Sequence, residues 1–167
     1  MKVPWRDVSS WYCAACGKCC KEYKVRLSFY EYLKLKHTGF IEEKVGRYYI
    51  RKVGNNCPFQ IGNLCSLQGE AKPIACKLYP FVVLKKGNEK ALYEYNNEEF
   101  YVYVELGCPN LKLGRANDKI EMLIGEAIQL FLGKKNTNLI TCHSEALITH
   151  HQSPLSAYPK RARKSIL

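Results

Sequence analysis

The sequence predicts an α+β fold with a short antiparallel meander and two or three helices. Between Phe81 and Val104, short apolar runs alternate with turn residues, as they do in neighbouring antiparallel strands. From Ile120 to Phe131, apolar residues recur at helical spacing. The 167-residue chain is 47 % hydrophobic, which is enough for one real core. It contains no run of about 18 apolar residues, so no membrane span is expected.

The length suggests one domain followed by a tail. We expect the domain to cover residues 1–151 and the tail to cover residues 152–167. The tail carries four basic residues and no acidic one, and its serine and proline content predicts a flexible or partner-dependent segment. The basic residues are Lys160, Arg161, Arg163 and Lys164.

The first half of the chain contains one clear helix start. Ser28 and Glu31 have the spacing of a capping box, which predicts a helix from Phe29 to about His37 that stops near Gly39. We expect Phe29 and Leu33, and more loosely Tyr32 and Leu35, to form its apolar side. Strands are predicted over 24–27 before the helix and over 45–53 after it.

In the second half of the chain, single cysteines lie in or next to predicted turns and short elements. Pro73 can begin a helical turn that carries Cys76, and Pro80 would end it. The third strand of the meander leads directly to Cys108. Asn117 or Asp118 then caps the helix with the apolar stripe, and Gly133 ends it. A last helix is expected over 139–148.

The densest feature of the sequence is the octet from Cys13 to Cys20, with four cysteines and a glycine inside the run. Its thiols would point in several directions in an ordinary core strand or helix, so the octet makes sense if they converge on a bound group. A Cys-x-x-Cys step turns two sulfurs toward one centre, and Gly17 lets the turn tighten. Adjacent Cys19 and Cys20 tend to point apart, which suggests two centres, or one centre and a spare thiol.

The chain has nine cysteines, and residues 1–10 contain no apolar region typical of a secretory signal. We therefore expect a reducing, cytoplasmic location, where clustered thiols bind metal more often than they form disulfides. Disulfides are the alternative. The predicted metal ligands are the eight clustered thiols, with Cys142 as a bystander and no help from histidine: Cys13, Cys16, Cys19, Cys20, Cys57, Cys65, Cys76 and Cys108. The domain would then be small and irregular, and bound metal would hold it together.

The cysteine spacing favours an iron–sulfur cluster, most simply [4Fe–4S]. Cys13, Cys16 and Cys19 have the spacing of a cluster loop, and Cys57 and Cys108 are each followed by proline, as remote cluster ligands often are. Zinc stays open as an alternative, because a tetrahedral zinc ion accepts the same four thiolates.

These motifs resemble the CxxCxxCC cysteine-cluster family. The resemblance rests on the octet, on Cys57-Pro58-Phe59, on Cys65, on the segment from Lys72 to Phe81 and on Cys108-Pro109, so it spans about residues 13–109. It implies a zinc- or iron-chelating protein, often labelled an iron–sulfur oxidoreductase, with the same eight cysteines as ligands. A similar cysteine region occurs in flagellin lysine methylases. Lys72 and Lys77 stand where the family commonly has arginines.

Three functions fit the sequence. The first is a cluster protein in electron transfer, redox sensing or support of methyl transfer. The second is a structural zinc or iron protein that binds RNA, a ribonucleoprotein or an acidic protein through its basic surface and tail. The formal charge of +11 favours such a partner, although eight thiolates and two bound centres lower it to about +7. The third is an enzyme, for which a redox-active cluster is the one catalytic candidate, since no nucleotide loop or serine elbow is found.

Overall fold

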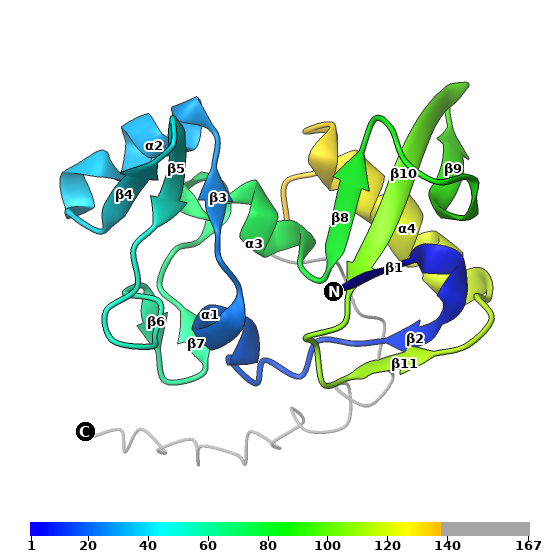
Figure 1. The fold of residues 1–167 in the computed structure, drawn as a ribbon, viewed down its shortest axis with the longest axis horizontal. Coiled ribbons are helices and arrows are strands. Elements are labelled where there is room, and N and C mark those ends of the chain that lie inside the picture. Colours follow the sequence, from blue (N-terminus) through cyan, green and yellow to red (C-terminus); the bar gives the residue numbers. More distant parts are fainter. Residues whose placement is uncertain (138–167) are drawn as a thin grey trace, which may run out of the picture.

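The computed structural model describes residues 1–137, which form a larger and a smaller lobe with segments 18–22 and 74–78 between them (Figure 1). The helices are α1 (Lys18–Glu22), α2 (Phe29–Leu35), α3 (Ile74–Leu78) and α4 (Asp118–Phe131). The strands are β1 (Lys2–Pro4), β2 (Val8–Trp11), β3 (Arg26–Leu27), β4 (Ile41–Lys44), β5 (Arg47–Ile50), β6 (Gln60–Ile61), β7 (Leu64–Cys65), β8 (Phe81–Leu84), β9 (Leu92–Tyr95), β10 (Glu98–Glu105) and β11 (Leu111–Leu113). This mixture of helices and short antiparallel strands confirms the α+β prediction.

The larger lobe is built around β10. Strand β8 pairs with one edge of β10, and β1 and β9 pair with the other, all antiparallel. Phe100, Val102 and Val104 of β10 are fully buried, which explains why this strand takes the central position. The order therefore differs from a simple meander, because β10 lies between β8 and β9.

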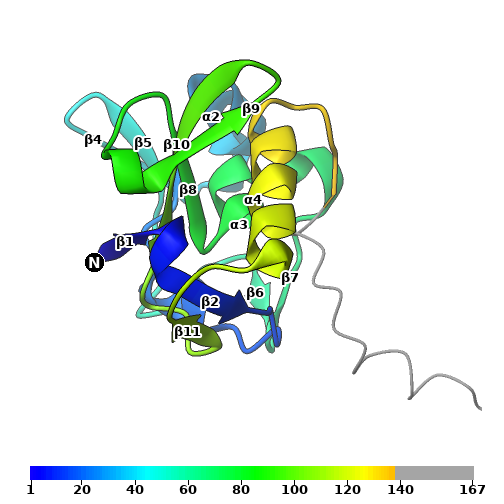
Figure 2. The ribbon, with the colours of Figure 1, turned by 90° about the vertical axis from the view of Figure 1, so that its right-hand side faces the viewer.

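Helix α4 covers one face of this sheet (Figure 2). Asn117 caps it, as predicted, and its Oδ1 accepts a hydrogen bond from the backbone N–H of Ile120 at 3.1 Å. The predicted apolar stripe is buried at Ile120, Ile124, Ala127 and Ile128. The stripe therefore forms the core face of the helix.

The smaller lobe consists of α2 and the sheet β3–β5–β4, with the β6–β7 hairpin below it (Figure 1). The capping box at the start of α2 is confirmed: the Glu31 N–H donates to Ser28 Oγ at 3.3 Å, and the Ser28 N–H donates to Glu31 Oε2 at 2.7 Å. A 3₁₀ turn extends the helix to Gly39, as expected. The buried core of this lobe is small: Val25, Leu27, Leu35, Ile50 and Phe59.

Two predictions for the smaller lobe are wrong in detail. Leu35 is the buried residue of α2, whereas Phe29 is 62 % exposed and Leu33 is 42 % exposed. The short helix meets the core only near its C-terminal end. The predicted strand over 45–53 shrinks to β5, because Val45 and Gly46 adopt positive φ angles and form the turn from β4, which the sequence did not predict.

No helix in residues 1–137 is both long and apolar enough to cross a membrane. The predicted last helix, the tail, the domain boundary at residue 151 and Cys142 lie outside the described residues.

The central position of β10 predicts a large effect of Phe100→Ala. Phe100 is fully buried, so its truncation leaves a cavity and should lower the free energy of unfolding by about 3–5 kcal/mol. Urea denaturation of the full chain measures this change. Met122→Ala is the control on α4, since Met122 is exposed and the change should stay within about 0.5 kcal/mol. An equally small effect of Phe100→Ala would contradict the strand order given above.

Candidate metal centre

The cysteine octet connects the two lobes. It leaves the larger lobe after Trp11 of β2 and ends in α1, which carries Cys19 and Cys20 and buries none of its residues in a core. Gly17 has a φ of +71°, and a Cβ at this position would lie 2.6 Å from Nε2 of Gln60. Glycine is thus required here, as the sequence indicated, and the backbone can turn sharply between Cys16 and Cys19.

The remaining cysteines come from four separate places. Cys57 precedes β6 and Cys65 ends β7, so the hairpin brings both to the same lobe. Cys76 lies on α3, whose first turn begins after Pro73 as predicted. Cys108 follows β10, so the central strand of the larger lobe places this thiol.

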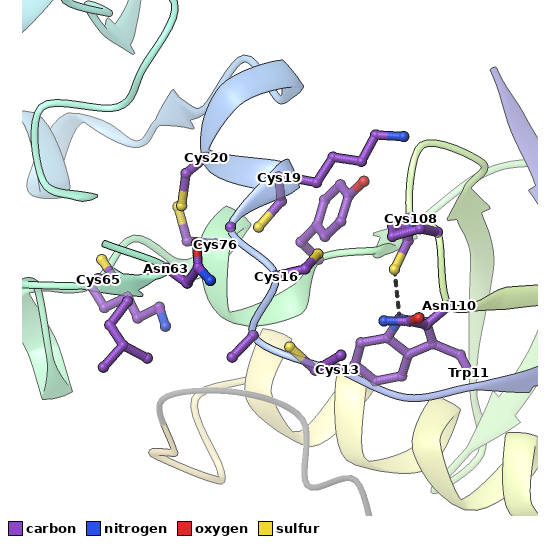
Figure 3. Close-up of a pocket in the computed structure, with 18 of the residues that line it drawn as sticks. Trp11, Cys13, Cys16, Cys19, Cys20, Asn63, Cys65, Cys76, Cys108 and Asn110 are labelled. Carbon is purple, nitrogen blue, oxygen red and sulfur yellow. Dashed lines mark hydrogen bonds between the residues drawn. The ribbon is translucent and has the colours of Figure 1, made fainter. Parts of the chain in front are cut away.

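Seven of the eight predicted ligands line one pocket of about 170 Å³ (Figure 3). They are Cys13, Cys16, Cys19, Cys20, Cys65, Cys76 and Cys108. Cys57 does not line the pocket, but its backbone N–H donates to the carbonyl oxygen of Cys20 at 3.1 Å. Within residues 1–137, none of the eight forms one of the disulfides considered as an alternative.

The thiols surround the pocket without yet converging on one point. Within residues 1–137, no three Cys, His, Asp or Glu side chains lie close enough together to hold a metal ion. Four thiolates around one zinc ion would each lie about 2.3 Å from it. The assignment of the eight cysteines as ligands therefore stays a prediction, and binding would have to draw the sulfurs inward.

The protonation of the thiols reflects how deeply they are buried. Burial raises the pKa values of Cys13, Cys57 and Cys76 above that of an ordinary thiol. The pKa of Cys19 is instead lowered to about 6, because the adjacent Cys20 thiol stabilises its thiolate. The Cys19 thiol therefore ionises more readily than an ordinary thiol, and the thiolate is the form that binds metals.

A buried lysine also lines the pocket. Lys72 is only 8 % exposed, and none of the ion pairs found in the described part of the chain includes it. The Lys72 ammonium lowers the pKa values of Cys19, which lies on α1 between the lobes, and of Cys76 in the smaller lobe. A buried cation is costly without a counter-charge, and thiolates in this pocket would supply it. This role of Lys72 was not predicted from the sequence, where its place just before Pro73 and Cys76 was the available signal.

Trp11 borders the pocket on the side of the larger lobe. Its indole Nε1–H donates to Sγ of Cys108 at 3.2 Å, and its ring packs edge-on against Phe81 (Figure 3). Hydrogen bonds to sulfur stabilise thiolates and tune metal–sulfur centres. Trp11 therefore forms an aromatic border of the pocket, whereas Trp5 packs against Tyr93 in the sheet core. Trp5–Asp7 form a 3₁₀ turn, and β2 follows it.

A family model named CxxCxxCC, with the description "Putative zinc- or iron-chelating domain", matches residues 12–111. The chain belongs to the CxxCxxCC family. The match covers the octet and all four remaining predicted ligands, through Cys108. Comparison with curated proteins and with solved structures finds no match. The soft sulfur donors of the pocket suit zinc and iron, the metals in the family's description.

The burial of Lys72 predicts a role in metal retention by this CxxCxxCC protein. Lys72→Met keeps most of the side-chain volume but removes the charge, and should weaken metal binding about tenfold, as the loss of a supporting contact typically does. Competition with a chelator measures the affinity.

Lys18→Met is the matched control, because Lys18 also lines the pocket but is more exposed and pairs with Glu22. Equal affinities of the two variants and the unaltered chain would show that Lys72 has no such role.

Proposed function

We propose that this CxxCxxCC protein holds an iron–sulfur cluster and works in electron transfer or redox sensing. The observation that carries the proposal is the gathering of seven thiols from both lobes around one pocket. Electron-transfer centres need a donor set that holds the metal in both oxidation states, and clusters obtain it from cysteine thiolates. The cluster, when bound, would supply reversible one-electron chemistry.

Two features of the pocket support a cluster over a single zinc ion. Its volume of about 170 Å³ is several times the ~30 Å³ that one water molecule occupies in the liquid, so there is room for more than one ion. The Trp11 N–H to Cys108 bond is the kind of contact that sets cluster potentials. A structural zinc site needs four thiolates and no such extra space.

The residues around the thiols would each contribute to this function. Trp11, packed against Phe81, covers one side of the pocket with an apolar ring, which favours a low local dielectric. Lys72 offsets part of the negative charge of the thiolates. Cys16 is exposed, so the centre would lie near the surface, where an electron partner can approach.

Elemental analysis tests the proposal. The full chain, purified without oxygen, should contain iron and acid-labile sulfide in equal amounts and show a broad brown absorbance. Exposure to air should bleach it. A colourless protein with stoichiometric zinc would leave the family assignment intact and contradict the iron–sulfur proposal.

Metal removal should loosen the smaller lobe selectively. Its core consists of five buried residues, and three of the predicted ligands, Cys57, Cys65 and Cys76, pack against that core. Hydrogen exchange after chelation should therefore speed up across residues 57–78, while β10 and α4 stay protected by the larger core. Unchanged exchange in both lobes would contradict a stabilising role of the metal.

RNA binding is a second candidate. Phe29 and Tyr30 expose their rings on α2, and the Lys34 ammonium lies 4.4 Å from the centre of the Tyr30 ring. Exposed aromatic faces beside cations are typical of surfaces that stack single-stranded bases. Binding to a single-stranded RNA should weaken steeply with salt and with Phe29→Ala. RNA binding that does not depend on salt, or no RNA binding at all, would contradict this second function.

A further inference from the structure

Five of the eight predicted ligands pack against one or the other hydrophobic core. Cys13 and Cys108 pack against the core of the larger lobe. Cys57, Cys65 and Cys76 pack against the core of the smaller lobe. Because each set is fixed to a different core, the two sets cannot all approach one point without separating a thiol from its support.

Helix α1 lies at the boundary and supplies a thiol to each side. Successive residues of an α-helix project about 100° apart, so Cys19 and Cys20 can serve different centres, although their thiols share a hydrogen bond in this structure. In Figure 3, Cys20 is drawn away from Trp11, Cys13 and Cys108. Besides the hydrogen bond with Cys19 and burial, Cys57 and Cys65 of the smaller lobe are close enough to Cys20 to raise its pKa. The backbone bond from Cys57 N–H to the Cys20 carbonyl joins Cys20 to the smaller lobe as well.

The electrostatic neighbours of the thiols follow the same division, except that Cys19 adjoins thiols of both sets. The pKa of Cys13 is raised by burial and by Cys19, Cys108 and Cys16. The pKa of Cys76 is raised by burial and by Cys65, Cys57 and Cys19. Cys19 borders both sets, but the smaller lobe already has four thiols with Cys20, while the larger lobe has only three without Cys19.

We infer that the chain holds two separate four-thiolate metal centres. The first consists of Cys13, Cys16, Cys19 and Cys108, and the second of Cys20, Cys57, Cys65 and Cys76. This inference rests on the proposed function only in requiring that the thiols bind metal. Four thiolates complete a zinc site and a [4Fe–4S] cluster alike, so the division holds for either metal. Lys72 acts on Cys19 of the first centre and Cys76 of the second, and therefore lies between the two.

Paired substitutions test the division in the full chain. Cys13→Ser with Cys108→Ser removes two ligands of the first centre, and Cys57→Ser with Cys76→Ser removes two of the second. Each pair should reduce the metal content per chain to about half, because one set of four thiolates stays complete. Cys13→Ser with Cys76→Ser damages both centres and should remove nearly all the metal. Cys142→Ser is the control and should keep the full content.

Alkylation of the unaltered chain provides a second measurement that does not depend on how the variants fold. The metal is withdrawn slowly with a chelator, and the freed thiols are alkylated and located by mass spectrometry. The four thiols of one centre should become reactive together, with Cys19 and Cys20 in different sets.

The outcomes separate this inference from the proposed function. If Cys13→Ser/Cys76→Ser keeps half the metal, or if Cys19 and Cys20 are released together with the same partners, the division is wrong and the metal site stands. If every paired variant loses all its metal, the alkylation pattern of the unaltered chain decides between two separate centres and one shared centre. If the unaltered chain binds neither iron nor zinc, the proposed function and this inference both fail.

Discussion

The structure depends on thiols that two small cores hold against one pocket. Neither core is large, and the segments that carry Cys57, Cys65 and Cys76 contribute few buried side chains of their own. Burial makes Cys13, Cys57 and Cys76 harder to ionise, while the Lys72 ammonium lowers the pKa values of Cys19 and Cys76. A bound cation would resolve this opposition, because it supplies a positive charge among the buried sulfurs.

This balance also accounts for the architecture around the pocket. The larger lobe is an ordinary sheet-and-helix unit, in which β10 and α4 bury a continuous apolar core. It can position Cys13 and Cys108 without help. The smaller lobe has a helix of two turns, strands of two to four residues and a hairpin that carries two ligands. Such a lobe gains most from a metal, since metal binding and folding are coupled where a core is small.

The sequence predicted the features that depend on local chemistry. Ser28 and Asn117 accept the capping bonds expected of them, Gly17 has the positive φ that the turn demands, and the stripe on α4 forms a core face. It did not predict the turn at Val45, whose β-branched side chain favours a strand, or the position of β10 between β8 and β9. Strand order depends on contacts between distant segments, which spacing alone does not reveal. The same limit applies to the site: the ordered cysteines were visible, whereas the burial of Lys72 and the bond from Trp11 to Cys108 require the folded chain.

X-ray absorption at the metal edge of the purified full chain tests the central claim most directly. If the sulfurs gather around bound metal, the first coordination shell should consist of about four sulfur atoms at roughly 2.3 Å, with no nitrogen or oxygen ligand. A shell dominated by oxygen or nitrogen, or a chain that contains no iron or zinc, would contradict the account.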